Sequence, residues 1–208
     1  MRSSLIAAIV VLMVVACGSS PSAAQGPTVA SVAVQPGDLP NSMHRCDLSG
    51  DINTFLTKIK TSSPSTYTTT KATWDLAQKN GATAGEVVFF ADSTTNCKDV
   101  AANTSGISSA TYKLVVDYVF QFKDEASATK YYSTESSQAQ LKTAGTPVTE
   151  GTKTGLGPNS VTVSFGFSSQ TFYIAVWQHK AFTVILAILN LDAATSQKVA
   201  VAENKRIT

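Results

Sequence analysis

Hydroxyl side chains and two histidines are the residues of this sequence that could support catalysis. The 208 residues include 24 serines and 26 threonines, but only two histidines, His44 and His179. A histidine that takes a proton from a serine or threonine hydroxyl is the central pair of many hydrolases, and its members need not be close in sequence. His179 is the candidate base, although its position beside Lys180 also suits a solvated hairpin turn.

Other catalytic motifs are incomplete. The segment Gly155-Leu156-Gly157 has no third glycine and no following Lys-Ser/Thr, so it indicates a tight turn rather than a phosphate-binding loop. No Gly-x-Ser-x-Gly elbow occurs. Paired carboxylates for glycoside chemistry are not visible. Three aspartates stand at expected helix starts (Asp51, Asp124, Asp192), and Asp117 is expected to face outward from a strand.

Four aromatic residues could instead line a pocket for a sugar or an acyl chain. They are Tyr131, Tyr132, Tyr173 and Trp177, and His179 follows shortly after them. Aromatic residues at helix and strand spacing more often belong to the core. These five residues are the candidate ligand-binding residues, with core packing as the alternative.

The N-terminus carries the pattern of an export signal. Arg2 is followed by an eleven-residue apolar stretch over 5–15. A membrane-spanning helix needs about 20 apolar residues, whereas the apolar core of a signal peptide has roughly 7–15. The stretch ends in Val14-Val15-Ala16-Cys17, and the following residues 18–22 are polar and small.

This order of features resembles the lipobox of bacterial lipoproteins. The resemblance implies a signal peptide over 1–16, cut by signal peptidase II, and a diacylglyceryl group on Cys17. Several acyl chains would hold the protein at the extracytoplasmic face of a bacterial cell membrane, because each buried CH₂ adds about 0.8 kcal/mol. Gly18 after the cysteine implies sorting to the outer membrane if the organism has one. The alternative is an ordinary secretory peptide cut after Ala24.

Residues 17–39 are expected to form the lipidated cysteine and a flexible tether, with a single domain over 40–208. Much of the tether is rich in Gly, Pro, Ser and Ala and shows no hydrophobic period. It contains no cluster of basic residues, so it is a spacer rather than a lipid sensor.

With Cys17 lipidated, Cys46 and Cys97 remain in an exported chain. The oxidising environment outside the cytoplasm favours a disulfide between them. A metal site is not expected, because neither these cysteines nor His44 and His179 have the spacing of metal ligands. The sequence indicates no cofactor.

Composition argues against several classes of protein. Sixteen basic and fourteen acidic residues give a net charge of +2, without the concentrated basic face that nucleic acid requires. The apolar fraction of 43% suffices for a core and argues against long disorder. Only 14% of the residues are charged, so much of the surface must carry hydroxyl groups.

The hydrophobic pattern predicts the elements that position these residues. Helices are expected over 51–60, from 67 or 70 to 79, in one or two turns within 93–101, from 124 to about 132, and after Asp192. Strands are expected over 86–91, 111–122, 160–165, 171–178 and 181–189. We predict one α+β domain. It has a mostly antiparallel sheet of about five to six strands flanked by helices, with a C-terminal β-meander and a closing helix.

Three segments of the second half occur in an order that is found in other proteins: 118–128, the turn 155–157 and Val176-Trp177-Gln178. It is similar to small bacterial envelope lipoproteins and to extracytoplasmic sensor-like domains of actinobacterial kinases. In those proteins a strand ending in Phe-x-Asp precedes an alanine-rich helix, and a Gly-Leu-Gly turn begins a meander. The resemblance spans about residues 112–207. It implies a fold and transfers no catalytic residue.

The expected function is that of a non-enzymatic, lipid-anchored cell-envelope protein that binds an envelope ligand or protein. The membrane is the expected partner through Cys17, and nucleic acid is not. Two alternatives stay open: an envelope hydrolase that uses His179 with a serine or threonine, and a structural envelope component without a specific pocket.

Overall fold

The computed structural model describes residues 26–135, 148–167 and 169–208. The predicted signal peptide, Cys17 and the first part of the tether lie outside the described residues. Among the residues that are described, no helix has the length and apolar character needed to cross a membrane.

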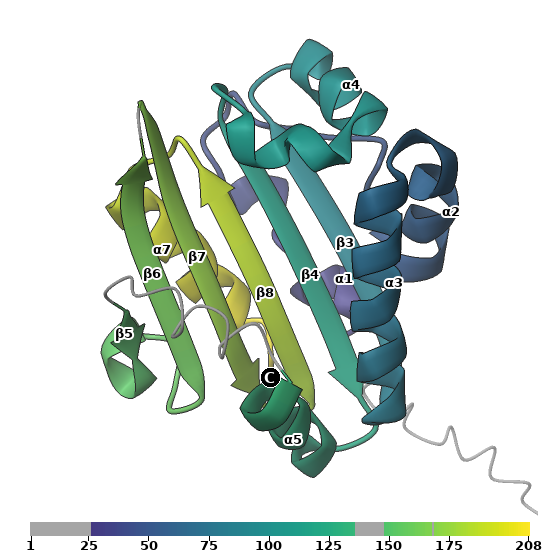
Figure 1. Cartoon of the computed structure of the whole chain (residues 1–208). Coiled ribbons are helices and arrows are strands. Elements are labelled where there is room, and N and C mark those ends of the chain that lie inside the picture. The colour runs from purple at the N-terminus through teal and green to yellow at the C-terminus, as the bar shows by residue number, and fades with distance from the viewer. Residues whose placement is uncertain (1–25, 136–147, 168) are drawn as a thin grey trace, which may run out of the picture.

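One antiparallel sheet organises the described chain (Figure 1). Its long strands lie in the order β3 (Ala82–Ala91), β4 (Leu114–Phe122), β8 (Phe182–Leu189), β7 (Gln170–His179) and β6 (Ser160–Phe167). Short strands β1 (His44–Arg45) and β2 (Gly50–Asp51) pair with β3, and β5 (Thr149–Glu150) pairs with β6. The predicted α+β class and meander are confirmed. The sheet has eight strands rather than five or six, because two-residue strands have no readable period.

Helices on one face of the sheet cover mainly β3 and β4. They are α2 (Ile52–Ser62), α3 (Pro64–Lys79), α4 (Thr94–Ala102) and the 3₁₀ helix η2 (Thr104–Ser109), and α5 (Glu125–Glu135) lies over one end of β4, β8 and β7. The apolar stripe of α2 is buried as predicted, with Phe55 stacked on Phe89 at 5.5 Å between ring centroids. Asp51 stands at the start of α2 as predicted and caps it by accepting the Asn53 and Thr54 amide N–H groups.

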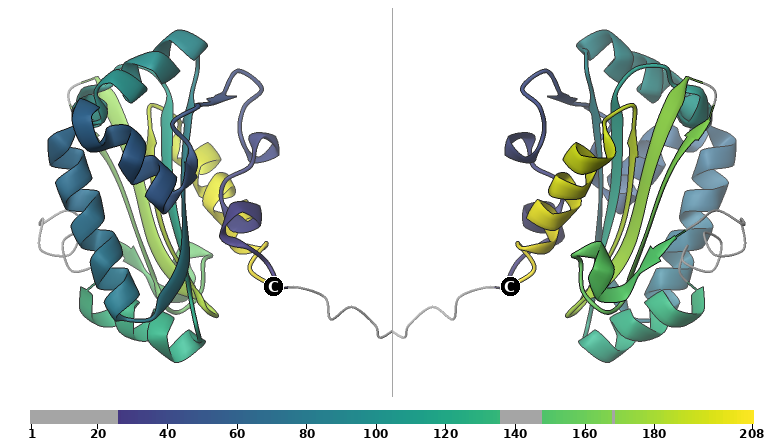
Figure 2. Two further views of the ribbon diagram at one scale, coloured as in Figure 1. Left: turned by 90° about the vertical axis from the view of Figure 1, so that its right-hand side faces the viewer. Right: turned by 90° about the vertical axis from the view of Figure 1, so that its left-hand side faces the viewer.

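The opposite face is covered by α1 (Val29–Val32), the 3₁₀ helix η1 (Pro36–Asp38) and α7 (Ala193–Asn204) (Figure 2). The predicted tether boundary at residue 39 is therefore wrong. Val32, Ala33 and Val34 are at most 2% exposed, and they pack into the core on this face of the sheet. Residues 28–39, here called the N-terminal strap, belong to the domain because the run 29–34 is apolar enough to be buried.

Two side chains fasten the N-terminal strap. The Arg206 guanidinium donates to the Val32 and Ala33 carbonyl oxygens at 3.0 Å each and binds the Asp38 carboxylate at 2.8 and 2.9 Å. The Val34 N–H donates to Asp117 Oδ2 at 2.9 Å. The strap, the closing helix and the central strand β4 are thereby joined.

The prediction that Asp117 faces outward is wrong, because the strap and α7 cover its side of β4. Asp117 and Glu203 are both 0% exposed, and their carboxyl groups are close enough to influence each other's ionisation. Neither has a basic ion-pair partner within the described ranges. Burial raises the pKa of Asp117 to about 7, and burial together with the nearby Asp117 charge raises the pKa of Glu203. The pair therefore holds at least one proton near neutral pH.

The Asp117–Glu203 pair makes the stability of the protein depend on pH. A carboxyl whose pKa is raised by folding stabilises the fold fully below its unfolded pKa, near 4, and this stabilisation is lost as pH rises through the folded pKa. We expect the free energy of unfolding to be about 2–3 kcal/mol higher at pH 5 than at pH 8. Urea unfolding followed by circular dichroism at the two pH values measures this difference.

Glu203→Gln is the matched control for that measurement. The amide keeps the shape of the side chain and does not titrate. The difference between pH 5 and pH 8 should shrink by the contribution of Glu203, while the contribution of the buried Asp117 remains. Equal or greater stability of the unmodified protein at pH 8 would show that the pair is not protonated in the folded state.

The predicted disulfide between Cys46 and Cys97 is confirmed. It ties the segment after β1 to α4, and the Cys46 N–H also donates to the Phe89 carbonyl at 2.9 Å. Cys46→Ser with Cys97→Ser should lower the free energy of unfolding by about 4 kcal/mol, because the bridge closes a loop between residues 51 positions apart. Urea unfolding of the double variant tests this, and a loss below about 1 kcal/mol would contradict it.

Candidate functional site: an uncharged cleft on the open half of the sheet

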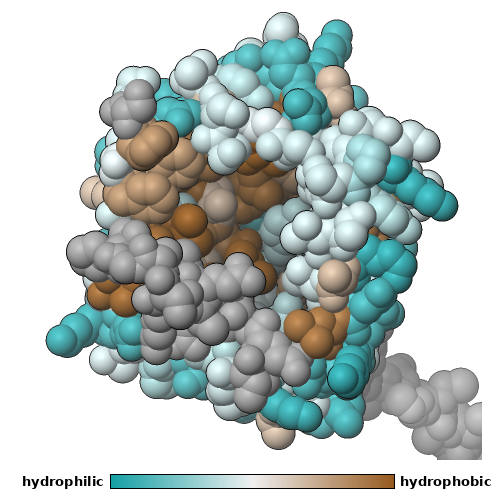
Figure 3. Space-filling view, viewed as in Figure 1, coloured by the Kyte–Doolittle hydropathy of each residue, from teal (hydrophilic) through white to brown (hydrophobic). Residues whose placement is uncertain are grey.

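The helices on the α3 side of the sheet leave part of that face open. They cover β3 and β4 and one end of β8 and β7, so side chains in the middle of β8, β7 and β6 remain accessible. Figure 3 shows the result as a hollow in the middle of this face, floored by apolar side chains. The hollow is a cleft of about 640 Å³.

The floor of the cleft is apolar. Alternate residues of a strand point to the same face, so Phe172 and Ile174 of β7 face the cleft while Tyr173 faces away. The rings of Phe165 on β6 and Phe172 are stacked, with centroids 5.0 Å apart and planes 8° from parallel. The floor is completed by Tyr118 of β4 and by Ala187 and Leu189 of β8.

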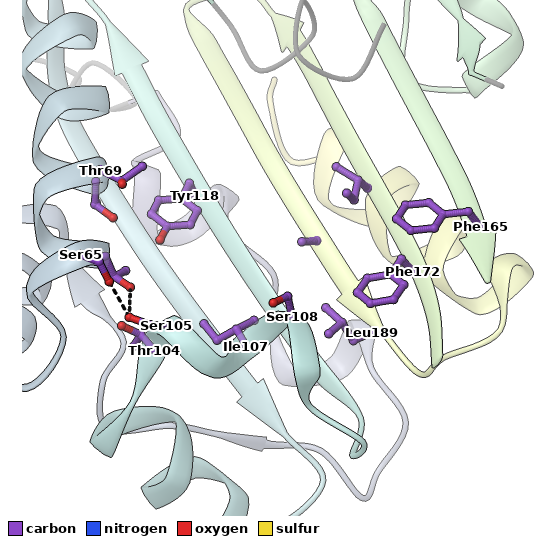
Figure 4. Close-up of a pocket in the computed structure, with 14 residues that line it drawn as sticks. Ser65, Thr69, Thr104, Ser105, Ile107, Ser108, Tyr118, Phe165, Phe172 and Leu189 are labelled. Carbon is purple, nitrogen blue, oxygen red and sulfur yellow. Dashed lines mark hydrogen bonds between the residues drawn. The ribbon is translucent and has the colours of Figure 1, made fainter. Parts of the chain in front are cut away.

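The wall of the cleft carries hydroxyl groups. Four come from one side of α3 and three from η2: Ser65, Thr66, Thr69, Thr70, Thr104, Ser105 and Ser108. Ser105 Oγ lies 2.7 Å from Ser65 Oγ and 3.3 Å from Thr66 Oγ1, which joins the two elements (Figure 4). The Thr104 N–H donates to Ser63 Oγ at 3.0 Å. Thr104 Oγ1 is buried and has no hydrogen-bond partner within the described chain.

Tyr118 lies where the floor meets the wall. Burial raises the pKa of its phenol, and a hydrogen bond with Thr70 on α3 acts in the opposite direction. The phenol is therefore neutral at physiological pH and presents a ring to the apolar floor.

The cleft carries no charge on any of its 14 lining residues. Its volume falls in the range of roughly 300–1,000 Å³ that small-molecule sites occupy. Within the part of the chain that the structure describes, the lining contains no histidine, carboxylate or cysteine that could act as a general base, a metal ligand or an activated nucleophile. Among all the residues that the structure describes, no three His, Cys, Asp or Glu side chains gather as a metal site requires. The arrangement can bind an uncharged ligand by apolar contact and hydrogen bonding.

The structure does not bring the five candidate ligand-binding residues together. Tyr131 is buried on the α3 side of the sheet against Phe122, with ring centroids 5.3 Å apart, and Tyr132 packs with residues of β6 and β7. Tyr173 and Trp177 are buried on the opposite face. The interpretation of these four aromatic residues as the lining of one pocket is wrong, and the core alternative describes them.

His179 lies at the end of β7, beside the turn at Lys180. Its Nδ1 is 2.9 Å from Asn204 Oδ1 of α7. This contact joins a strand to the closing helix through an amide, whereas the hydrolase hypothesis requires a serine or threonine hydroxyl beside the imidazole. The described contact of His179 is thus structural.

The residues that do line the cleft escaped the sequence analysis for a physical reason. Helix α3 begins at Pro64, a favoured first helical position, rather than at 67 or 70. Its hydroxyl pairs Ser65/Thr69 and Thr66/Thr70 have the i, i+4 spacing that places side chains on one side of a helix. The spacing predicts a hydroxyl-bearing helix face only if the helix starts at residue 64, and the expected start at 67 or 70 excludes Ser65 and Thr66 from it.

Comparisons with known proteins add one weak likeness. No protein family model and no curated protein match the chain. A solved structure that resembles it is the extracellular domain of PknH from Mycobacterium tuberculosis, at a TM-score of 0.45 and 13% sequence identity. The match covers 64% of this chain and 68% of that one. It belongs to the class of extracytoplasmic kinase domains noted on the sequence, and a likeness this distant carries no argument about function.

Proposed function

We propose that the chain is a non-enzymatic, lipid-anchored protein of the bacterial cell envelope that binds a ligand in the cleft between α3, η2 and the open half of the sheet. The observation that carries this proposal is the cleft of about 640 Å³, with an apolar floor and an uncharged wall. Contiguous apolar surface open to water is costly, and on soluble domains it commonly marks a binding site.

Binding is favoured over catalysis by the state of the hydroxyl groups. Ser65 and Thr66 each hydrogen-bond to Ser105, and the described residues of the lining offer no base to remove a proton from any of the three hydroxyls. A neutral serine hydroxyl is a weak nucleophile. The same hydroxyls are effective hydrogen-bonding groups for a ligand.

The location outside the cytoplasm is supported by two features of the chain. The Cys46–Cys97 disulfide suits an oxidising compartment. The lipobox-like leader supports a lipid on Cys17, and the folded domain starts near residue 28. Ten residues, 18–27, span at most about 35 Å, so an anchored domain stays close to the membrane surface.

The cleft can be blocked without disturbing the covered core. Ala187 lies half-buried on the floor, and Ala187→Trp should fill the cleft, whereas Ala194→Trp places the same side chain on the exposed surface of α7 on the other face. We expect an organic-solvent extract of bacterial envelopes to raise the Tm of the native protein and of Ala194→Trp, by roughly 5–10 °C at a hundredfold excess of ligand over Kd. Ala187→Trp should show no rise.

Differential scanning fluorimetry measures these shifts, and circular dichroism checks that each variant folds. A rise of equal size in Ala187→Trp and Ala194→Trp would place the ligand outside the cleft. No rise in the native protein would count against ligand binding altogether.

The lipid anchor is tested by Cys17→Ser in the full precursor. The unmodified protein should sediment with membranes and resist a high-salt wash, because the acyl chains are buried in the bilayer. The variant should move to the soluble extracytoplasmic fraction, and mass spectrometry of the native protein should show an acylated N-terminal cysteine. Membrane retention of both forms to the same extent would exclude this anchor.

A further inference from the structure

We infer that the cleft holds an uncharged amphiphile, with a hydroxyl-bearing head against Ser105 and an apolar tail along β8, β7 and β6. This inference rests on the proposed function and narrows it to a class of ligand. Three features of the cleft support it: the separation of polar from apolar groups, the lack of charge, and the unused hydrogen-bonding capacity of the wall.

The hydroxyl groups of Ser65, Thr104 and Ser105 and the stacked phenylalanines lie at opposite ends of the cleft. In Figure 4, Ser65, Thr104 and Ser105 lie on the side of α3 and η2, whereas Phe165 and Phe172 lie on the far side, over β6 and β7. A ligand that is polar throughout would leave the stacked phenylalanines unused, and a pure hydrocarbon would cover hydroxyl groups without bonding them. A molecule with one polar and one apolar end matches both.

The head group must be neutral to match the charge of the site. A carboxylate or phosphate that entered the cleft would lose water and meet no lysine, arginine or histidine among the described residues of the lining. An ammonium head would meet no carboxylate there either. Charge complementarity therefore selects an uncharged ester, alcohol or sugar head.

The wall has hydrogen-bonding capacity to spare. Each hydroxyl offers one donor and two acceptor sites, so the three hydroxyls of Ser65, Thr66 and Ser105 retain at least one donor after their two mutual contacts. The neighbouring Thr104 Oγ1 is buried without a partner within the described chain. A head that carries both donors and acceptors would satisfy these groups together.

The test uses three soluble probes with the same ten-carbon acyl or alkyl tail: 1-monodecanoylglycerol, decanoate and decyltrimethylammonium. Isothermal titration calorimetry with the full mature chain should give at least tenfold tighter binding of monodecanoylglycerol than of either charged probe. Ser105→Ala should weaken monodecanoylglycerol binding by about fivefold to tenfold, which corresponds to one hydrogen bond.

Ser109→Ala is the matched control. Ser109 is an exposed serine at the end of the same 3₁₀ helix, outside the lining, and its hydroxyl donates to the Gly106 carbonyl at 3.1 Å. This variant should bind monodecanoylglycerol like the native protein. Because both serines are exposed, neither change should prevent folding.

Several outcomes would overturn the inference. Decanoate or decyltrimethylammonium binding as tightly as monodecanoylglycerol would refute a neutral head, and equal losses in Ser105→Ala and Ser109→Ala would refute the assigned position of the head. If none of the probes binds while the envelope extract still stabilises the native protein and not Ala187→Trp, the ligand class is wrong and the proposed function stands. If the extract also fails in that comparison, both are wrong.

Discussion

The structure depends on a sheet that is apolar on both faces, while the described helices leave the middle of one face open. Strands β7 and β8 place apolar side chains alternately on the two sides, so each face needs a layer that excludes water. The N-terminal strap and α7 cover the back of the sheet. On the other side the helices sit over β3, β4 and one end of β7 and β8. The cleft is the part of that face that these helices leave uncovered, and its floor is apolar because the strands place apolar side chains there.

Strand β4 connects the two sides of the molecule through adjacent residues. Asp117 points to the back, where it accepts the Val34 N–H of the strap and lies near the buried Glu203, while Tyr118 points to the cleft. A buried carboxyl pair is a costly way to stabilise a core. Its role here is to position the strap, because a buried backbone N–H needs an acceptor. The segment that leads to the proposed anchor is thereby fixed to the strand that lines the ligand site.

The elements that the sequence predicted well are the long ones with a clear period. The nearly unbroken apolar run over 182–189 specified the strand β8, and the spacing of Ile52, Phe55, Leu56 and Ile59 specified α2. The strap was missed because its short apolar run sits among Gly, Pro and Ser residues, which usually mark a spacer. The inward position of Asp117 follows from that error, since only the strap and α7 give its carboxyl a buried environment. The disulfide was predictable from the leader and the cysteine count.

The cleft was not predictable because its residues come from six separate elements, and none of them carries a residue type that signals chemistry. Histidines, carboxylates and aromatic residues are the types that signal a site in a sequence, whereas this site uses serine and threonine, which are the commonest polar residues of this chain. The low charge content of the chain affects the solvation of the cleft. A wall of lysine and glutamate would have solvated the open half of the sheet, while a wall of hydroxyls leaves it apolar enough to accept a tail and polar enough to orient a head.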